Sequence, residues 1–184
     1  MPVNNTEPLI SNCLLGDHKA TSELYNLYAE KMYGVCLNYA KNKNDAKDIL
    51  QEGFIKIFRN LQKYRNEGSF EGWIRKIMVN TAISYSRQSG NLHVSCEGLE
   101  DFMAEHKNPI DKLLEKDLRF ITEKLSRGYK IVFYLRAVEG YSHEQIAEKL
   151  GISCNTSKSQ YCRARNILQK MVVDHNRVVN PLAN

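Results

Sequence analysis

The chain has 184 residues, of which 42% are hydrophobic and 26% are charged. This composition excludes a largely disordered chain and suits one large or two small packed domains. No apolar run approaches the length of a membrane span, and the N-terminus lacks the pattern of a signal peptide. We therefore expect a cytoplasmic protein without stable membrane insertion.

The net charge of +5 is unevenly distributed along the chain. Residues 1–88 hold 12 Lys and Arg against 9 Asp and Glu, and residues 112–184 hold 13 against 7. Residues 89–111 hold 1 against 5. Basic segments attract polyanions such as nucleic acid. The acidic segment between them would be repelled by the same partner, so its charge needs another explanation.

The N-terminal part of the chain is predicted to be helical. A short apolar piece ends at Gly16 and Asp17, and a long helix then spans about residues 18–40. Residues 42–44 form a polar break, after which Asn44 or Asp45 is expected to cap the next helix. The positions expected to be buried, from their helical spacing, are Ala20, Leu24, Leu27, Tyr28, Met32, Cys36 and Tyr39 in the long helix and Ala46, Ile49, Leu50, Phe54, Ile57, Phe58 and Leu61 in the next.

The polar side of this second long helix is acidic. Asp45, Asp48 and Glu52 are spaced by three and four residues, and Gln51 lies alongside. Such a face can simply be solvated, can dock a basic partner, or can serve metal binding or acid–base catalysis. A di-metal bundle needs Glu-x-x-His pairs on other helices, and this chain has none. A solvated face and a protein-docking face therefore remain the main alternatives.

A loop at residues 66–69 precedes a third predicted helix. The apolar stripe of this helix comprises Phe70, Trp73, Ile74, Ile77, Met78, Thr81, Ala82 and Tyr85. The opposite side carries Glu71, Arg75, Lys76, Val79, Asn80, Ser84 and Arg87, and the chain before it carries Tyr64, Arg65, Asn66, Ser69 and Phe70. Aromatic rings interleaved with cations and amides suit single-stranded nucleic acid. On spacing alone, Phe70 and Trp73 are more typical of a core than of a base-stacking platform.

Residues from about 88 to 108 show no sustained periodicity and are interpreted as a linker. A helix is expected to follow Pro109, with apolar positions at Ile110, Leu113, Leu114, Leu118, Ile121 and Leu125. Five apolar residues at 131–135 suit either a buried strand or a buried helix. No other segment offers a strand partner, so a helix is expected. Residues 176–184 are expected to be a frayed tail.

Residues 140–165 have the pattern of a helix-turn-helix. Ser142 and Gln145 stand at the positions of a capping box. Gly151 suits the left-handed end of the first helix, and Ser153 can cap the second. A turn this short forces the two helices to cross steeply, as they do in DNA-binding units of this kind.

The second helix of this unit divides by face. Tyr161, Ala164, Ile167, Leu168 and Met171 are expected in the core. The residues expected outside are Asn155, Thr156, Lys158, Ser159, Gln160, Arg163 and Arg165. Amide and hydroxyl groups suit base edges, and Lys and Arg suit phosphates. A solvated helix is the alternative, but the capped and glycine-punctuated pair favours DNA.

No metal, cofactor or catalytic residue is predicted. The five cysteines (Cys13, Cys36, Cys96, Cys154 and Cys162) contain no C-x-x-C pair, which is typical of free thiols in a reducing cytosol. His93 and Cys96 lie three residues apart without a second ligand pair. A surface loop is therefore a better interpretation of them than a zinc site.

Three motifs, in this order along the chain, resemble the extracytoplasmic-function (ECF) group of bacterial RNA polymerase sigma factors. Residues 45–54 (DAKDILQEGF) are similar to the segment with which those factors grip the clamp coiled coil of core RNA polymerase. Residues 64–82 (YRNEGSFEGWIRKIMVNTA) resemble their segment for promoter melting and for the element just upstream of the start site. The helix-turn-helix resembles their second DNA-binding domain, which reads an element further upstream.

The resemblance implies a role for each matched residue. The polymerase-binding set is Asp45, Asp48, Gln51, Glu52 and Phe54. The set for promoter melting and the proximal element is Tyr64, Arg65, Ser69, Phe70, Arg75, Lys76, Asn80, Ser84 and Arg87, with Asn80 at the pocket for a flipped promoter base. The set for the upstream element is Asn155, Thr156, Lys158, Ser159, Gln160, Arg163 and Arg165.

Three positions depart from the family pattern. Ser157 stands where an apolar residue is common, Gln160 where an arginine is common, and Ser84 where an acid is more frequent. These departures bear on which DNA sequence is preferred and leave the class unchanged.

The resemblance implies an all-α protein with two small helical domains: an N-terminal helical bundle and a C-terminal bundle with the helix-turn-helix, joined by a flexible acidic linker. Residues 1–88 would form a domain like sigma region two, 89–111 the linker, 112–175 a domain like sigma region four, and 176–184 a flexible tail. In the family, the connector threads through channels that otherwise hold nucleic acid. A negative connector can mimic that occupant.

The function implied is that of a promoter-specificity subunit, which binds core RNA polymerase, recognises two promoter elements and helps open the DNA without being an enzyme. The expected partners are core RNA polymerase, promoter DNA as duplex and as melted single strand, and an anti-sigma factor. The free protein is expected to be a monomer. A conventional helix-turn-helix regulator, usually a dimer with an effector pocket, is the first alternative. A small helical metalloenzyme using Asp45, Asp48 and Glu52 is the second.

Overall fold

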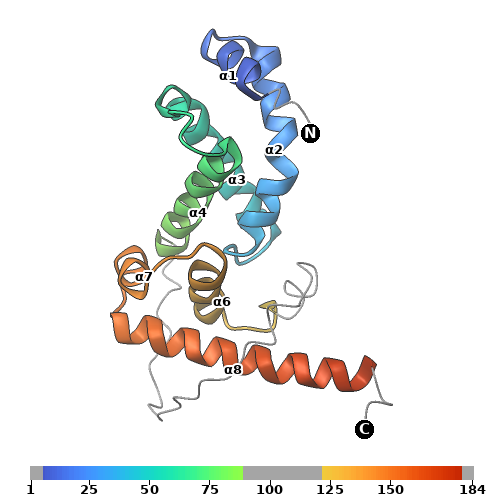
Figure 1. Ribbon diagram of the computed structural model, residues 1–184, viewed down its shortest axis with the longest axis vertical. Coiled ribbons are helices and arrows are strands. Elements are labelled where there is room, and N and C mark those ends of the chain that lie inside the picture. Colours follow the sequence, from blue (N-terminus) through green and yellow to red (C-terminus); the bar gives the residue numbers. More distant parts are fainter. Residues whose placement is uncertain (1–5, 89–121, 180–184) are drawn as a thin grey trace. The chain divides into compact units, whose positions relative to one another are not determined.

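Every secondary-structure element in the computed structural model is a helix within the part of the chain that it describes, residues 6–88 and 122–179 (Figure 1). Gln88 and residues 173–179 are described by their backbone alone. The chain divides into two compact units, Met1–Ser89 and Gly90–Asn184. The expectation of an all-α fold is therefore confirmed. The predicted linker at 89–111 and the apolar positions from Ile110 to Ile121 lie outside the described residues.

The first unit is a bundle of three long helices with a short one against it. The long helices are α2 (His18–Leu37), α3 (Lys43–Asn60) and α4 (Phe70–Gln88), and they pack on one another. A 3₁₀ turn, η1 (Leu61–Lys63), follows α3 directly. The short helix α1 (Thr6–Leu14) packs on α2 and on η1 (Figure 1).

Side chains that precede the helices fix where these begin. Asp17 caps α2 by accepting hydrogen bonds from the amides of Lys19 at 2.7 Å and Ala20 at 3.4 Å. Asn42 caps α3 through the amide of Asp45 at 2.8 Å. A cap of this kind stabilises a helix by about 1 kcal/mol. The expectation that Asn44 or Asp45 caps α3 was wrong, because Asn42 holds the extended backbone that a cap requires and the helix begins at Lys43.

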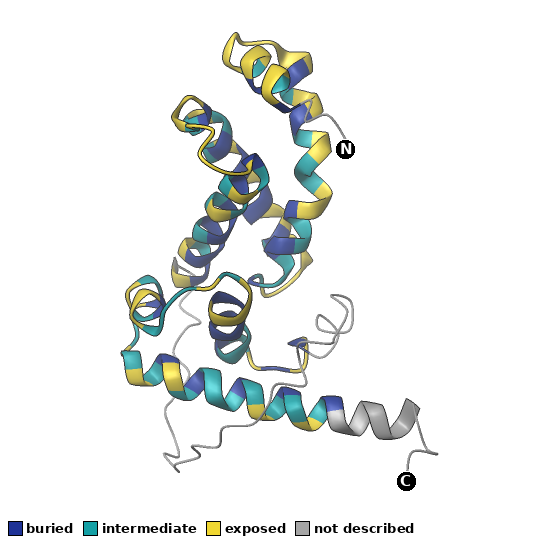
Figure 2. Cartoon of the chain, viewed as in Figure 1, coloured by how far each residue is buried: buried dark blue, intermediate teal, exposed yellow. Residues whose placement is uncertain are grey.

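The core of the first unit lies along one side of α3 and between it and its two neighbours (Figure 2). Ile49 and Ile57 of α3 and Met78 of α4 are completely buried. Gly53 lies between them on the same side of α3, and a Cβ atom there would overlap the Sδ atom of Met78. The missing side chain therefore lets α3 and α4 approach closely.

Two predicted positions of this core were wrong. Leu27, expected to be buried, is 59% exposed, because it lies one turn before Lys31, at the edge of α2 where that lysine pairs in solvent with Glu71 of α4 at 2.6 Å. Val79, expected on the polar side of α4, is fully buried. The reason is that α4 packs against both α2 and α3, so apolar contact extends over two flanks of the helix rather than one.

The second unit contains α6 (Arg127–Phe133), η3 (Tyr134–Val138), α7 (His143–Leu150) and α8 (Cys154–Val179), with α6 and α7 packed on α8. All five residues at 131–135 are buried and helical, which confirms the helix and excludes the strand. A cluster of buried side chains joins α6 to α8, and it comprises Leu125, Phe133, Ala164, Leu168 and Val172.

Two local features of the second unit are a π-helical turn after α6 and the length of α8. η3 is a π-helical turn, in which the amide of Glu139 donates to the carbonyl of Tyr134 five residues earlier, at 3.0 Å. Such turns are rare insertions in helices. In addition, α8 continues to Val179, three residues beyond the start of the tail expected at residue 176. The periodic pattern of the helix weakens there, but the backbone remains helical.

Replacement of Gly53 by alanine tests the close approach of α3 and α4. We expect Gly53→Ala to lower the free energy of unfolding by about 1–3 kcal/mol, the usual cost of overpacking a core. Urea unfolding followed by the fluorescence of Trp73 measures it. Gly72→Ala is the matched control, because a Cβ atom there meets only the end of the Ser69 side chain. A Gly53→Ala protein as stable as the wild type would contradict the packing described.

Candidate protein-docking and nucleic-acid interfaces

The outer face of α3 is acidic, as predicted. The buried stripe of this helix faces its neighbours, and it leaves Asp48, Gln51 and Glu52 exposed and Asp45 half-buried. Glu52 forms an ion pair with Lys56 one turn later at 2.6 Å. This pair is solvent-exposed, and such pairs contribute little to stability. The carboxylate of Glu52 is therefore not required to hold the helix in place.

An apolar side chain that the sequence analysis did not select lies in the middle of this acidic face. Ile55 is 50% exposed, and it follows Glu52 by three residues and Gln51 by four. Residues at these spacings are neighbours on a helix surface. The signal was present in the sequence, because Ile55 is the one apolar residue of α3 that falls opposite the predicted core stripe.

Phe54, by contrast, is not part of this surface. It is 4% exposed, and its ring lies 4.6 Å from that of Tyr25 and 6.0 Å from that of Phe58, centroid to centroid. The assignment of Phe54 to a polymerase-binding set is therefore corrected. The reason is its helical position, because it follows Leu50 by four residues on the buried stripe of α3.

Two carboxylates of α3 are tied to α4 through one phenol. The hydroxyl of Tyr85 lies 3.5 Å from Oδ1 of Asp45 and 3.4 Å from Oδ2 of Asp48. Burial, and next the negative charges of these two carboxylates, raise the pKa of Tyr85. The phenol therefore stays protonated and can donate to either carboxylate. Within residues 6–88 and 122–179, no group of three His, Cys, Asp or Glu is placed to hold a metal ion.

The loop that precedes α4 is built around an aromatic cluster. The ring of Tyr64 lies 5.1 Å from that of Phe70 and 5.5 Å from that of Trp73. Phe70 is 6% exposed and also contacts Tyr28 of α2 at 5.6 Å. Phe70 is thus a core residue, and its assignment to the DNA-contacting set is corrected. Trp73 is half-buried.

Hydrogen bonds from two side chains hold the backbone of this loop. The hydroxyl of Tyr64 donates to the carbonyl of Gly68 at 2.8 Å and to Oδ1 of Asn66 at 3.1 Å. Asn66 has a φ of 58° and Gly68 a φ of 102°, and this left-handed region suits asparagine and glycine. The amide of Gly72 donates to Oγ of Ser69 at 3.1 Å. The loop is thereby fixed with Arg65 and Ser69 exposed.

One face of α4 remains open to solvent, and it carries a polar stripe. Trp73, Asn80 and Arg87 follow one another at intervals of seven residues, which places them along one side of the helix. Lys76 and Ser84 are exposed on the same side, and Asn80 is half-buried. The hydroxyl of Ser84 donates to the carbonyl of Asn80 at 3.0 Å. Arg75 is half-buried and lies on another side of the helix, so the structure does not bring it together with this stripe.

The predicted helix-turn-helix is present with its caps. The hydroxyl of Ser142 accepts from the amide of Gln145 at 3.2 Å, and the amide of Ser142 donates to Oε1 of Gln145 at 2.9 Å. Gly151 ends α7 with a φ of 68°. The hydroxyl of Ser153 accepts from the amide of Thr156 at 3.0 Å at the start of α8. All three predictions about these termini are confirmed.

The outward face of α8 is narrower than predicted. Asn155 and Lys158 are exposed, and Thr156 and Ser159 are half-buried. Gln160, predicted outside, is only 6% exposed. It is buried because Ser157, Gln160 and Ala164 follow one another at three and four residues along the side that faces the core. Gln160 is therefore corrected to a core position.

Both arginines assigned to this face contact tyrosines. The guanidinium of Arg163 donates to the hydroxyl of Tyr129 on α6 at 3.3 Å. That of Arg165 lies 5.9 Å from the ring centroid of Tyr161. Both side chains are half-buried. Asn166, which the sequence analysis did not select, is exposed and follows Ser159 by seven residues, so it extends the outward face.

A buried hydroxyl joins the two helices of this unit. Ser157 is fully buried, and its Oγ lies 2.9 Å from Nδ1 of His143 on α7. Burial lowers the pKa of His143, as do the positive charges of Arg136 and Lys158, and the negative charge of Glu144 opposes them. The neutral imidazole is therefore the form that packs here. The polar residue at position 157 is satisfied by a polar partner.

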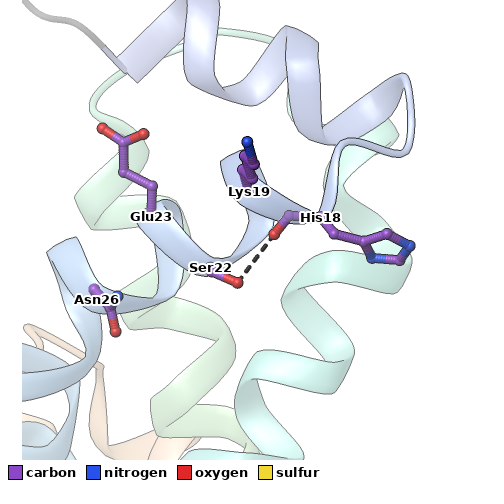
Figure 3. Close-up of a pocket in the computed structure, with 5 residues that line it drawn as sticks. All are labelled: His18, Lys19, Ser22, Glu23 and Asn26. Atoms are coloured by element: carbon purple, nitrogen blue, oxygen red, sulfur yellow. Dashed lines mark hydrogen bonds between the residues drawn. The ribbon is translucent and has the colours of Figure 1, made fainter.

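A pocket of about 490 Å³ lies on the first turns of α2 (Figure 3). Its lining residues are His18, Lys19, Ser22, Glu23 and Asn26. All five belong to one helix, and Figure 3 shows the hydroxyl of Ser22 bonded to the carbonyl of His18. A single helix cannot enclose a small molecule, and enzyme sites bury most of their ligand. The surfaces described above are stronger candidates for function.

No helix of the described part of the chain is long and apolar enough to span a membrane.

Comparison with known proteins gives two family matches in the expected order. The profile for Sigma-70 region 2 matches residues 24–91, and that for Sigma-70, region 4 matches residues 116–168. The ECF RNA polymerase sigma-E factor of Haemophilus influenzae is 30% identical over 179 residues, which cover 90% of this chain and 94% of that protein. The ECF RNA polymerase sigma factor SigE of Mycolicibacterium smegmatis is 31% identical, over 84% of this chain and 62% of that longer protein.

Solved structures are also similar, and one of them serves as an example. It is the sigma factor RpoE from Bartonella quintana, solved in complex with the anti-sigma factor NepR. The match has a TM-score of 0.46 and 22% sequence identity, and it covers 82% of this chain and 95% of that one.

The contact between His143 and Ser157 predicts a pH dependence of the second unit. The pKa of His143 is lowered from the usual 6.5 in the folded protein, so the unfolded chain binds a proton more readily. The stability that the neutral ring contributes is thus present above the unfolded pKa and is lost as the pH falls below it. Hydrogen exchange of α7 and α8, corrected for its intrinsic pH dependence, should show less protection at about pH 5.5 than at about pH 7.5. His143→Gln, which cannot titrate, should lose less protection, and equal losses in both proteins would contradict the contact.

Proposed function

The chain belongs to the ECF group of RNA polymerase sigma factors, and on this premise we propose that it binds core RNA polymerase through the outer face of α3 and contacts promoter DNA through α4 and α8. It would act as the promoter-specificity subunit of the holoenzyme. Family membership supports the function of the whole chain. The surfaces described above support the assignment of each step to particular residues.

The observation that carries the proposal is the arrangement around Ile55. An exposed apolar side chain at the centre of a polar face is the usual composition of a protein interface, where a few central residues contribute most of the binding energy and the polar rim excludes water. Asp48, Gln51 and Glu52 form that rim here. Their charge would speed association with a basic partner surface. Asp45 and Asp48 are in addition oriented by the phenol of Tyr85.

The open face of α4 and the loop before it are the proposed binding surface for melted promoter DNA. A half-buried tryptophan, an amide and cations lie along this face, and unstacked bases bind to such surfaces by stacking and by contact of their phosphates with cations. Asn80 lies at the centre of the stripe and is the proposed contact for a flipped base. Arg65 and Ser69 are exposed on the loop that precedes the same helix.

The outward face of α8 is the proposed reader of the upstream element. In helix-turn-helix proteins, the N-terminal residues of the second helix contact base edges in the major groove. Asn155 and Ser159 supply groups for base edges, and Lys158 supplies a charge for a phosphate. Gln160 is excluded from this set by its burial.

An anti-sigma factor is a further proposed partner, on the basis of family membership alone. The chain would then be active only after release from that partner, and its location in the cytoplasm follows from the polymerase that it serves.

Binding to core RNA polymerase tests the docking face. We expect Glu52→Lys and Ile55→Ala each to weaken binding of the labelled full-length chain by about 2 kcal/mol or more, as for central interface residues. The two matched controls are on α2. Glu30→Lys makes the same charge change at an exposed position, and Leu27→Ala removes an apolar side chain that is even more exposed than Ile55. Unchanged affinity of both test variants, or equal losses in the controls, would contradict the proposal.

Two substitutions on α8 should have different effects on DNA recognition by the reconstituted holoenzyme. The promoter is first selected by the wild-type holoenzyme from a pool of random duplexes. Asn155→Ala should then weaken binding to the selected upstream element by about 1–3 kcal/mol and relax the sequence preference of the holoenzyme. Lys158→Ala should instead weaken binding to all duplexes alike and lower the slope of the salt dependence of binding by about 1. An equal loss of affinity for all duplexes in the Asn155→Ala protein would show that this residue does not read a base.

A further inference from the structure

The N-terminal helix is bonded to the loop that precedes α4, although the two lie far apart in the sequence. Nδ2 of Asn66 donates to Oε1 of Glu7 on α1 at 2.6 Å, across 59 positions of the chain. The acceptor is a carboxylate, so the bond is charge-assisted. Neither the proposed docking face nor the proposed DNA contacts account for it.

Glu7 is not needed to hold α1 on the bundle. α1 is docked by buried groups, because Ile10 and Thr6 are both 8% exposed and Oγ1 of Thr6 lies 3.5 Å from the hydroxyl of Tyr28. Glu7 and Asn66 are themselves exposed. The bond between them therefore acts chiefly on the loop, where it adds a tie to α1 to the hydrogen bonds and ring contacts that Tyr64 makes.

Asn66 is the residue through which the loop can be controlled. Its backbone has a positive φ, and its Oδ1 accepts from the hydroxyl of Tyr64, whose ring lies against Trp73. A group that fixes the side chain of Asn66 therefore fixes the turn, the phenol of Tyr64 and, through ring contact, the first residue of the open face of α4. Glu7 is in that position.

We propose that Glu7 is a positioning residue, which holds residues 64–69 in the conformation that receives single-stranded promoter DNA. This inference rests on the proposed role of α4 in promoter opening. Glu7 itself would not contact the DNA, because its negative charge is repelled by phosphates. Its contribution is to order the loop before DNA arrives, so that less conformational entropy is lost on binding.

Fluorescence of the free protein tests the structural part of this inference. Trp73 is the single tryptophan of the chain, so its quenching by acrylamide reports on the loop without DNA or polymerase. Glu7→Ala should raise the quenching constant, whereas Glu7→Gln, which keeps an oxygen acceptor, should leave it close to that of the wild type. Glu23→Ala, which removes an exposed carboxylate from α2, is the matched control. Unchanged quenching in Glu7→Ala would overturn the inference.

Exchange of the donor and the acceptor between positions 7 and 66 tests whether the hydrogen bond itself positions the loop, or whether any substitution there disturbs the structure. Asn66→Asp places two carboxylates together and should raise the quenching constant. In the double variant Glu7→Gln and Asn66→Asp, the glutamine amide donates to the new carboxylate, and the quenching constant should return towards that of the wild type. Asp at position 66 still accepts from Tyr64. Failure of the double variant to recover would overturn the role of the bond.

The role of Glu7 in promoter opening is tested on the promoter that the wild-type holoenzyme selects. Glu7→Ala holoenzyme should open duplex promoter about two- to tenfold more slowly, the factor that corresponds to one net hydrogen bond. Its affinity for core polymerase should be unchanged, and a pre-melted promoter should reduce the defect only in part because the loop must still order around the strand. Normal opening by a protein whose quenching has changed would overturn the role in opening. Failure of the wild-type chain to bind polymerase would instead contradict the proposed function itself.

Discussion

The close approach of α3 to α4 at Gly53 is the constraint on which the arrangement of the first unit depends. Because no side chain separates the helices there, Met78 lies directly against α3, and a Cβ atom at position 53 would overlap its Sδ atom. In this packing Phe54 is buried, and Ile55 is exposed with its acidic neighbours. Packing of α4 against both α2 and α3 buries two of its flanks and leaves one open face, on which Trp73 and Asn80 lie. The packing of these three helices thus sets both the proposed docking face and the proposed DNA-binding face.

Local signals in the sequence predicted the helices and their ends well. The capping box at Ser142, the left-handed Gly151 and the cap at Ser153 all depend on neighbouring residues, and all are present. Predictions of burial failed at positions where packing against other helices decides whether a residue is buried. Leu27 has the spacing of a core residue but lies at the edge of α2, and Val79 lies on a second buried flank that only the packing of three helices creates. Periodicity indicates that a helix has a buried side, but neighbouring helices decide how wide that side is.

Spacing within one helix was also insufficient to predict all residues of the candidate sites. The acidic residues of α3 were predicted from their spacing, yet Ile55 was missed because an isolated apolar residue on a polar face is usually incidental. Gln160 was placed outside because it is polar, although its position on α8 is a core position shared with Ser157 and Ala164. The hydroxyl of Ser157 is satisfied by a partner on another helix, His143 of α7. Such partners are distant in sequence, so spacing within one helix cannot reveal them.

Site-specific photo-crosslinking is the most direct test of the central claim, that the outer face of α3 is the surface that meets core RNA polymerase. A photoreactive amino acid would replace Ile55 in one protein and Glu30 of α2 in another, and each would be irradiated in reconstituted holoenzyme. We expect a crosslink to a polymerase subunit from position 55 and none from position 30. Holoenzyme that forms normally but crosslinks only from position 30, or from neither position, would contradict it.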